Sequence, residues 1–267
     1  MHLTAVIFDW AGTVVDHGSH APVATLDSVF ADAGLPITVA EARLSMGIAK
    51  RAHIAAILAL PRVSAEWKRT FGAMPVEEDI DRLYRDFMPK QLACLREHSD
   101  VISGVAQAVA ELRARDLKIG STTGYTRPML DLLRDSAKDQ GFVPDFAACP
   151  DDVPGGGRPA PWMCYLNAIQ MRVGPLWTMV KIGDTPSDIA EGRNAGMWTI
   201  GVTRTGNEVG LTAAEWMHAT PPEQSALLAK AAIRLLEAGA HYLSESVADC
   251  VAIIDEIERR LAAGERP

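Results

Sequence analysis

The stretch AVIFDWAGT, Ala5 to Thr13, decides the fold of this 267-residue chain. Its first four residues form an unbroken apolar run, which is typical of a strand buried on both faces of a parallel sheet. Asp9 ends the run. Because a lone buried carboxylate is costly, we expect Asp9 just beyond the carboxyl edge of the sheet, where open α/β sheets bind ligands. Gly12 permits a tight turn, and Thr13 offers a hydroxyl and a backbone N–H to an anion. A strand ending in an Asx turn is the alternative.

A second apolar strand runs into a second acidic cluster. Residues 179–182, MVKI, lead directly into GDTPSD at residues 183–188. If the two strands are neighbours, Asp9, Asp184 and Asp188 converge, which like-charge repulsion disfavours unless a cation binds between them. Oxygen ligands favour Mg²⁺, completed by waters and a substrate phosphate. Helix capping is the alternative role for Asp188, which precedes the helical pattern IAEGRNAG.

Composition narrows the class of protein. The chain is longer than one average domain and 48% hydrophobic, which predicts a larger and a smaller domain with a sizeable core. A net charge of -8 argues against a nucleic-acid surface. The four cysteines are scattered without a CxxC motif or a secretory leader, which is typical of reduced thiols. No apolar run approaches the ~20 residues that cross a bilayer, so we expect a cytoplasmic protein that binds neither membranes nor nucleic acid.

The region that follows the first strand shows helical patterns and no strand. Thr38 and Glu41 form a capping-box pattern, and Ser64 is the expected cap of a later helix. Pro89 interrupts an apolar helical pattern and predicts a kink or a helix boundary. We therefore expect residues 18–99 to form an all-helical cap domain, with hinges near Gly18 and near residues 100–104.

From residue 104 onward, helices and strands alternate. The expected helices are 105–115, 127–140, 161–171, 189–195 and 246–263, and the expected strands are 117–122, 146–149, 179–183, 198–202 and a short edge strand at 241–243. This alternation predicts an α/β core with a doubly wound, Rossmann-like parallel sheet. Residues 1–17 and 100–267 are assigned to that core domain, into which the cap is inserted.

Three motifs occur in a fixed order along the chain: DWAGT at residues 9–13, STTGYTR at 121–127 and GDTPSD at 183–188. In this order they resemble the haloacid dehalogenase superfamily of phosphotransferases and, within it, the phosphonoacetaldehyde hydrolases. The resemblance extends over nearly the whole chain through MGIAKRAH, PDDVPGGGRPAPWMCY and GRNAGMWTIGV. It implies a Mg²⁺-dependent enzyme that hydrolyses the carbon–phosphorus bond of phosphonoacetaldehyde to acetaldehyde and phosphate, in a homodimer joined through the cap domain.

Lys50 and His53 share one face of an expected helix, at positions i and i+3. Direct attack at the phosphorus of a carbon–phosphorus bond would expel a bare carbanion, whereas a protonated imine formed by a lysine and the aldehyde accepts that electron pair. The amine must be neutral, and we expect cap closure and the charge of Arg51, or of a protonated His53, to lower its pKa. The resemblance implies this role for Lys50, with His53 as a proton relay and Met46 beside them. A solvated lysine and a half-buried structural histidine are the alternatives.

Ala11 occupies a position where most phosphatases of this superfamily carry a second aspartate, the general acid for an alkoxide leaving group. Alanine cannot protonate a leaving oxygen, and it offers only its backbone carbonyl, a suitable Mg²⁺ ligand. An enamine leaving group does not need that acid. The substitution therefore favours carbon–phosphorus cleavage over ester hydrolysis, although it equally fits an inactive protein.

The remaining candidates bind phosphonate oxygens or line the cleft. Thr123, beside Gly124, resembles the second motif of the superfamily and presents a hydroxyl at a strand end, with a turn capped by Thr126 as the alternative. The resemblance places Arg158 against the nucleophile and the phosphoryl group, where a planar guanidinium suits phosphonate oxygens, and a surface arginine is the alternative. Lys181 is a weaker candidate because a position inside a strand does not direct it to the sheet edge. Gly47 and Tyr125 complete the expected substrate-binding set.

The expected reaction has two covalent stages. Lys50 forms an imine with the aldehyde, and Asp9 attacks phosphorus while Mg²⁺ and the side chains of Thr13, Thr123 and Arg158 hold the phosphonate. The enamine leaves, and water then releases phosphate from Asp9. Two other functions stay open: a generic Mg²⁺-dependent phosphatase or sugar-phosphate mutase on this scaffold, and a non-catalytic interaction protein with this fold. Ala11 and Lys50 argue against the first, and the complete set of site residues argues against the second.

Overall fold

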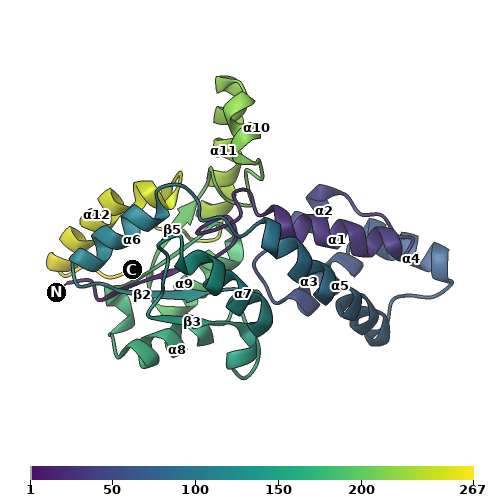
Figure 1. Ribbon diagram of the computed structural model, residues 1–267, viewed down its shortest axis with the longest axis horizontal. Coiled ribbons are helices and arrows are strands. Elements are labelled where there is room, and N and C mark those ends of the chain that lie inside the picture. Colours follow the sequence, from purple (N-terminus) through teal and green to yellow (C-terminus); the bar gives the residue numbers. More distant parts are fainter. Residues whose placement is uncertain (1) are drawn as a thin grey trace.

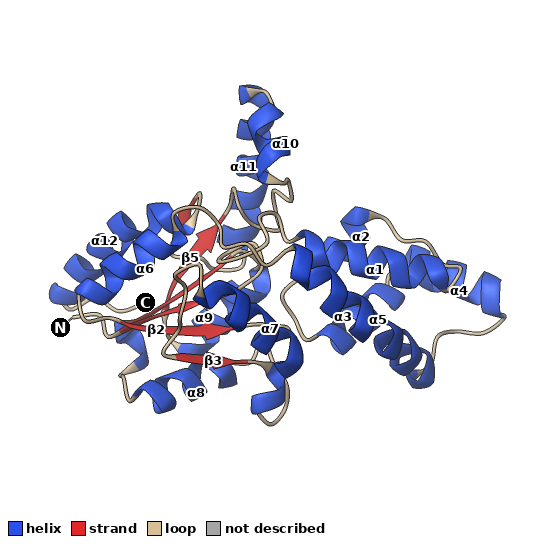
Figure 2. Cartoon of the chain, viewed as in Figure 1, coloured by secondary structure: helices blue, strands red, loops and turns tan. Residues whose placement is uncertain are grey.

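The computed structural model describes residues 2–267 and contains a six-stranded sheet (Figures 1 and 2). The strands are β1 (Ala5–Phe8), β2 (Lys118–Thr122), β3 (Phe146–Ala148), β4 (Met179–Gly183), β5 (Trp198–Val202) and β6 (Tyr242–Ser244). Their spatial order is β3-β2-β1-β4-β5-β6, and every neighbouring pair is parallel. Strand β1 lies between β2 and β4, with Phe8 paired with Ser121 on one side and Ile182 on the other. The carboxyl ends of these three strands therefore meet at one edge.

Helices cover both faces of this sheet, as the alternating pattern predicts. They are α6 (Val105–Ala114), α7 (Arg127–Lys138), α8 (Trp162–Met171), α9 (Pro186–Ala195) and α12 (Cys250–Ala262), with 3₁₀ turns at Pro150–Asp152, Leu176–Thr178 and Val247–Asp249. Successive residues of β1 point to opposite faces. Val6 and Phe8 join the core formed with α6, α7 and α12, whereas Ala5 and Ile7 pack with buried residues of α8. The predicted doubly wound α/β fold, including its edge strand, is confirmed.

The segment between β1 and α6 contains helices joined by loops and contributes no strand to the sheet. It comprises α1 (His20–Asp32), α2 (Val39–Arg43), α3 (Lys50–Leu58), α4 (Pro61–Phe71) and α5 (Glu77–Glu97), which gather on the right of Figure 1. The capping box of Thr38 and Glu41 is confirmed. Ser64 is not a cap: α4 begins at Pro61, whose fixed φ suits the first turn, and Ser64 lies inside the helix. Helix α5 continues through Pro89 and so has no boundary there.

Two further helices, α10 (Ala213–His218) and α11 (Pro221–Glu237), were not predicted from the sequence. They follow a loop, residues 203–211, that leaves the carboxyl end of β5, and they project from the sheet at the top of Figure 1. Capping boxes begin both helices, through Thr212 with Glu215 and Thr220 with Glu223. No helix within residues 2–267 combines the length and apolar character needed to span a bilayer.

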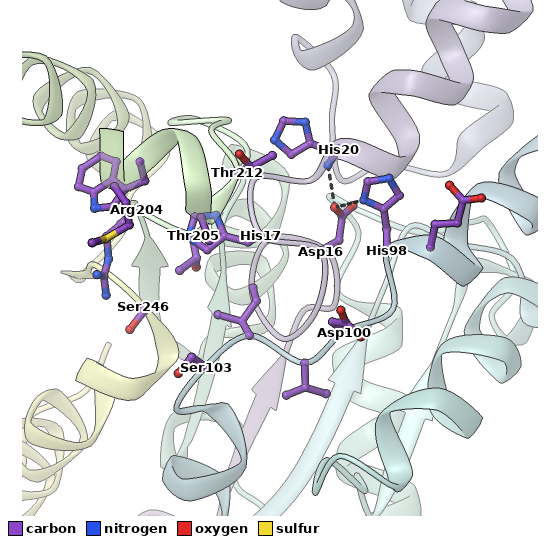
Figure 3. Close-up of a pocket in the computed structure, with 16 residues that line it drawn as sticks. Asp16, His17, His20, His98, Asp100, Ser103, Arg204, Thr205, Thr212 and Ser246 are labelled. Carbon is purple, nitrogen blue, oxygen red and sulfur yellow. Dashed lines mark hydrogen bonds and ion pairs between the residues drawn. The ribbon is translucent and has the colours of Figure 1, made fainter. Parts of the chain in front are cut away.

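A cavity of about 440 Å³ lies beside the two chain connections that link the helical segment to the sheet (Figure 3). Asp16, on the first connection, accepts hydrogen bonds from the backbone N–H groups of His20 and Ala21, both at 2.9 Å, and so caps α1. Its carboxylate also pairs with Nδ1 of His98, on the second connection, at 3.3 Å, and this contact raises the pKa of His98. The ion pair therefore joins the two expected hinge regions.

Candidate active site

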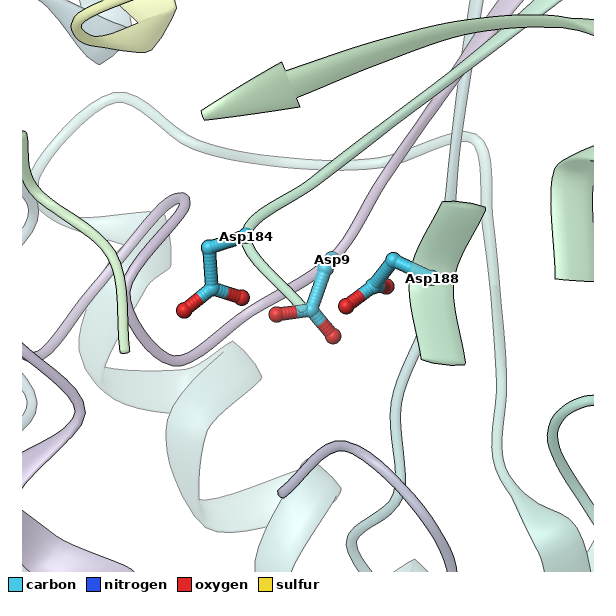
Figure 4. Close-up of side chains that lie close together, drawn as sticks. All are labelled: Asp9, Asp184 and Asp188. Atoms are coloured by element: carbon cyan, nitrogen blue, oxygen red, sulfur yellow. The ribbon is translucent and has the colours of Figure 1, made fainter. Parts of the chain in front are cut away.

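Three buried carboxylates converge at the carboxyl ends of β1 and β4 (Figure 4). Asp9 follows β1 directly, Asp184 follows β4, and Asp188 lies in the first turn of α9. One oxygen of each lies within 4.8 Å of the others. The predicted convergence is confirmed, and it results from the adjacency of β1 and β4 in the sheet.

Asp184 has one oxygen bound by the protein and one free. Its Oδ2 accepts hydrogen bonds from the backbone N–H of Asn207 at 2.7 Å and from the hydroxyl of Ser19 at 3.2 Å. Its Oδ1 is buried and has no partner among residues 2–267. Burial, together with the charges of Asp9 and Asp188, holds the pKa of Asp184 well above its usual range. An open carboxylate oxygen within a cluster of like charges fits a hard divalent cation.

Asp188 is held through both of its oxygens. Oδ1 accepts from Lys181 Nζ at 2.6 Å and lies 3.0 Å from Nη1 of Arg158. Oδ2 accepts from the hydroxyl of Thr185 at 2.6 Å and from its backbone N–H at 3.3 Å, which completes a capping box. The predicted capping role is confirmed, and the cationic neighbours lower the pKa of Asp188 against the effect of burial. Its contact with a metal stays a prediction.

Arg158 donates hydrogen bonds to several groups at the centre of the site. Nη2 donates to Asp9 Oδ1 at 2.7 Å and to the carbonyl of Thr122 at 2.8 Å. Nη1 donates to the carbonyl of Gly47 at 3.2 Å, and Nε donates to Glu191 Oε2 at 2.9 Å. The guanidinium is buried, so each of these hydrogen bonds forms away from bulk water. Arg158 thus touches the proposed nucleophile, the second motif and the helical segment at once.

Sequence reasoning missed Glu191 and underestimated Lys181. Both side chains are fully buried, and Lys181 reaches from the middle of β4 to Asp188 because its four-carbon stem spans the gap to α9. Lys181 Nζ lies 3.6 Å from Glu191 Oε2, which also accepts from the hydroxyl of Thr122 at 2.8 Å. The available signals were a lysine inside a fully apolar strand and a glutamate one turn after Asp188 in a helix whose first turn faces the site.

Lys50 is the first residue of α3, and its amine points into the site from the helical segment. The residue is only 5% exposed, and Nζ lies 4.7 Å from the centre of the Tyr125 ring. Burial lowers the pKa of Lys50 to about 8; the charge of Arg158 acts in the same direction, whereas Asp9 opposes it. Arg51 is not the source of this shift, because it is directed to Glu77 and Asp81 on the surface, at 2.6 and 2.8 Å. The expected direction is confirmed, but Arg158 supplies the repulsion.

Lys50 and Asp9 line the same small cavity, whose volume is about 20 Å³. Ten residues singled out from the sequence line it: Asp9, Ala11, Met46, Gly47, Lys50, Thr123, Gly124, Tyr125, Arg158 and Asp184. Ser19, Pro22 and Thr185 complete the lining. The hydroxyl oxygen of Thr123 accepts the backbone N–H of Tyr125 at 3.1 Å, which leaves its own proton free to donate.

Three other predicted site residues, Asp188, His53 and Thr13, lie outside the lining of this cavity. Nε2 of His53 contacts the carbonyl of Ala42 at 2.9 Å, and burial next to Lys50 lowers the pKa of His53 to about 3, so its ring is neutral. The backbone N–H of Thr13 donates to Trp10 at 3.2 Å, and its hydroxyl is buried without a partner among residues 2–267. Proton relay by His53 and anion binding by Thr13 stay predictions.

Comparisons with known proteins agree with this geometry. The family model "haloacid dehalogenase-like hydrolase" matches residues 3–196. Phosphonoacetaldehyde hydrolase of Nitratidesulfovibrio vulgaris is 47% identical over 98% of this chain and 94% of that protein. The enzyme of the same name from Bacillus cytotoxicus is 45% identical over 97% of this chain and 98% of that protein.

Solved structures give the same result. A phosphonoacetaldehyde hydrolase-like protein from Oleispira antarctica is 40% identical, with a TM-score of 0.98 over 100% of this chain and 96% of that one. A putative β-phosphoglucomutase from Bacteroides vulgatus, 19% identical with a TM-score of 0.68 over 97% of this chain and 91% of that one, shares the fold. The chain is therefore an enzyme of the haloacid dehalogenase-like hydrolases and belongs, within them, to the phosphonoacetaldehyde hydrolase family.

Proposed function

We propose that this enzyme hydrolyses the carbon–phosphorus bond of phosphonoacetaldehyde to acetaldehyde and phosphate. The observation that carries the proposal is that a buried amine, Lys50 of helix α3, and a buried carboxylate, Asp9 at the end of β1, line one cavity. The curated relatives that bear the name of this activity are 45–47% identical over nearly the whole chain, which supports the same substrate. A two-carbon aldehyde with a phosphonate at its other end needs both groups.

Lys50 acts first, on the aldehyde. Its pKa of about 8 leaves part of the amine neutral near pH 7, and the neutral nitrogen adds to the aldehyde carbon. Loss of water from the adduct gives a protonated imine. This cation accepts the electron pair of the carbon–phosphorus bond when that bond breaks, and an enamine on Lys50 results. Ala11 fits this chemistry, because a leaving enamine requires no general acid at that position.

Asp9 acts on phosphorus. Its carboxylate attacks in line and becomes an aspartyl phosphate as the enamine departs, and water then releases phosphate. Arg158 holds Asp9 through the 2.7 Å hydrogen bond, and the free hydroxyl proton of Thr123 is available to a phosphonate oxygen. Tautomerisation of the enamine and hydrolysis of the imine release acetaldehyde and restore Lys50.

Mg²⁺ would be held by Asp9, Asp184 and the carbonyl of Ala11, with Asp188 beside it. The free, buried Oδ1 of Asp184 and the convergence of three carboxylates support this assignment. When bound, the cation neutralises the charge of the carboxylates and of the phosphonate oxygens.

Substrate entry requires movement of the helical segment. A cavity of about 20 Å³ is too small for a two-carbon phosphonate, since ~10–15 Å³ of such space holds a single water. We propose that residues 18–99 move as a cap domain over the core formed by residues 1–17 and 100–267. In the closed arrangement the hydroxyl of Ser187 donates to the carbonyl of Met46 at 3.2 Å. Opening admits substrate, and closure dehydrates Lys50.

The proposal includes a homodimer formed through the cap and a cytoplasmic location. Five large apolar side chains are 45–59% exposed in the cap: Val39, Leu44, Phe71, Met74 and Val76. All four cysteines are free thiols, as a reducing compartment favours. Sedimentation of the native protein and of a Phe71→Glu variant tests the dimer, and an unchanged sedimentation coefficient of the variant would argue against this face.

Borohydride trapping tests the proposed function. The enzyme is treated with borohydride with and without phosphonoacetaldehyde, and the labelled peptide is mapped by mass spectrometry. We expect a two-carbon label on Lys50 only when substrate is present, and no label at that site in the Lys50→Arg variant. Active enzyme without a label on Lys50 would overturn the imine step. Faster turnover of p-nitrophenyl phosphate than of phosphonoacetaldehyde would instead support a generic phosphatase.

A further inference from the structure

Arg43, the last residue of α2, connects the cap to the loop of residues 203–211. Its Nη1 donates to the carbonyl of Gly18 at 2.7 Å and to Oδ1 of Asn207 at 3.0 Å, and its Nη2 donates to the carbonyl of Gly210 at 3.2 Å. Nδ2 of Asn207 returns a hydrogen bond to the carbonyl of Arg43 at 3.4 Å. Within residues 2–267 this guanidinium has no carboxylate partner within 4.0 Å, and it binds carbonyl and amide oxygens instead. Arg43 therefore holds the backbone and one side-chain amide of this loop in place through neutral hydrogen-bond acceptors.

The same loop holds Asp184. The backbone N–H of Asn207 donates to Asp184 Oδ2 at 2.7 Å, which leaves Oδ1 free. Gly206 packs so closely that a Cβ on it would lie 2.5 Å from Cβ of Asp184. The loop is also fastened to the nucleophile segment, because the hydroxyl of Thr205 donates to the carbonyl of Gly12 at 2.8 Å. The loop thus fixes which oxygen of Asp184 faces the proposed metal position.

We propose that Arg43 is a positioning residue that couples closure of the cap to metal binding. In the closed state it fixes Asn207, which holds Asp184 with Oδ1 directed to the metal position. Because such coupling is reciprocal, occupation of the metal site stabilises the closed cap by the same factor. This inference rests on the metal site of the proposed function and adds a route by which the cap acts on it.

Calorimetric titration of Mg²⁺ in saturating inorganic phosphate tests the coupling. The Arg43→Ala enzyme should bind Mg²⁺ about tenfold more weakly than the wild type, at the low end of the range for residues that support metal ligands. Arg62→Ala is the matched control, because Arg62 is a cap arginine whose partners, Glu41 and Pro36, also lie in the cap. Its Mg²⁺ affinity should stay within about twofold of the wild type. A purely structural role of Arg43 in the cap would change KM and leave Mg²⁺ affinity unchanged.

A double-mutant cycle with Asn207→Ala tests whether Arg43 acts on Asp184 through the side chain of Asn207. This substitution removes the side-chain contacts with Arg43 but keeps the backbone N–H that binds Asp184 and the carbonyl that accepts from Arg43 Nη1 at 3.3 Å. In that background, Arg43→Ala should weaken Mg²⁺ binding by clearly less than tenfold, because part of its effect passes through the side chain of Asn207. If Arg43→Ala weakens Mg²⁺ binding tenfold in both the wild-type and the Asn207→Ala background, Arg43 does not act through the side chain of Asn207.

Wild-type Mg²⁺ affinity in the Arg43→Ala enzyme would overturn the coupling alone. A wild-type enzyme that binds no Mg²⁺ would overturn the metal site and the coupling with it. If Arg43→Ala does not fold, as judged by circular dichroism, Arg43→Lys replaces it, because lysine keeps the charge but loses the planar fork. This variant should weaken Mg²⁺ binding in the same direction, and unchanged affinity would again contradict the proposal.

Discussion

Replacing Lys50 by methionine should abolish turnover and make the folded enzyme more stable at pH 7. The residue is 5% exposed, and its pKa falls from 10.5 to about 8 on folding. At ~1.4 kcal/mol per pKa unit, protonated Lys50 costs the folded state about 3 kcal/mol. Methionine has a similar length and carries no charge, so it should recover most of that free energy without a cavity.

The pH dependence of this gain identifies its cause. Because the pKa of Lys50 is lower in the folded state, the unfolded chain binds the additional proton between about pH 8 and pH 10.5, and wild-type stability rises with pH over that range. The advantage of Lys50→Met should therefore be full at pH 7, about 1.4 kcal/mol at pH 9.5, and nearly absent above pH 11.

Urea unfolding at pH 7 and pH 9.5, at one fixed Mg²⁺ concentration, measures the free energies of unfolding. Lys118→Met is the control, since Lys118 is exposed at the start of β2 and its replacement should change stability little at either pH. A Lys50→Met variant that is no more stable than the wild type at pH 7, or equally stabilised at both pH values, would refute the dehydration of Lys50.

Three further predictions concern activity. The value of kcat/KM should rise about tenfold per pH unit below pH 8 and level off above pH 8, as Lys50 loses its proton. The inflection near pH 8 should not move in a His53→Asn enzyme, because the pKa of His53 is about 3. An inflection that does move would assign the titration to His53. Gly124→Ala should lower kcat/KM about 100-fold while the melting temperature stays within a few degrees of the wild type. The added Cβ would lie 2.5 Å from the carbonyl oxygen of Gly47 and would keep the cap from closing on the core. Wild-type kinetics would contradict this close approach. Chelation by EDTA should abolish phosphate release and added Mg²⁺ should restore it, whereas full activity after exhaustive chelation would exclude a metal-dependent reaction.

The features that sequence could predict are those set by local pattern and by the geometry of a parallel sheet. An apolar run followed by a carboxylate places Asp9 at a strand end, and a second such run does the same for Asp184. Parallel strands share the edge at which their carboxyl ends lie, so the convergence follows if the two strands are neighbours. Lys50 could be singled out because the expected chemistry requires an amine.

The features that sequence could not predict depend on long-range packing. Ser64 has the propensity of a cap, but Pro61 begins α4 one turn earlier and places Ser64 inside the helix. The pairing of Arg158 with Glu191 joins residues 33 positions apart, and nothing local indicates it. Helices α10 and α11 are different, because the capping patterns TAAE and TPPE are local signals of both helix starts.

Burial and the charge of Arg158 explain why the amine of Lys50 loses its proton more readily than an ordinary lysine, whereas the charges of Asp9 and Asp184 oppose this loss. Six buried ionisable side chains surround the site: Asp9, Asp184, Asp188, Glu191, Arg158 and Lys181. Four of them are acidic and two are basic, so their charges sum to minus two, which one divalent cation balances. A cation bound by Asp9 and Asp184 would offset the two carboxylate charges that favour the protonated form of Lys50. Binding of a divalent ion beside Asp9 would therefore also favour the neutral amine that the imine requires.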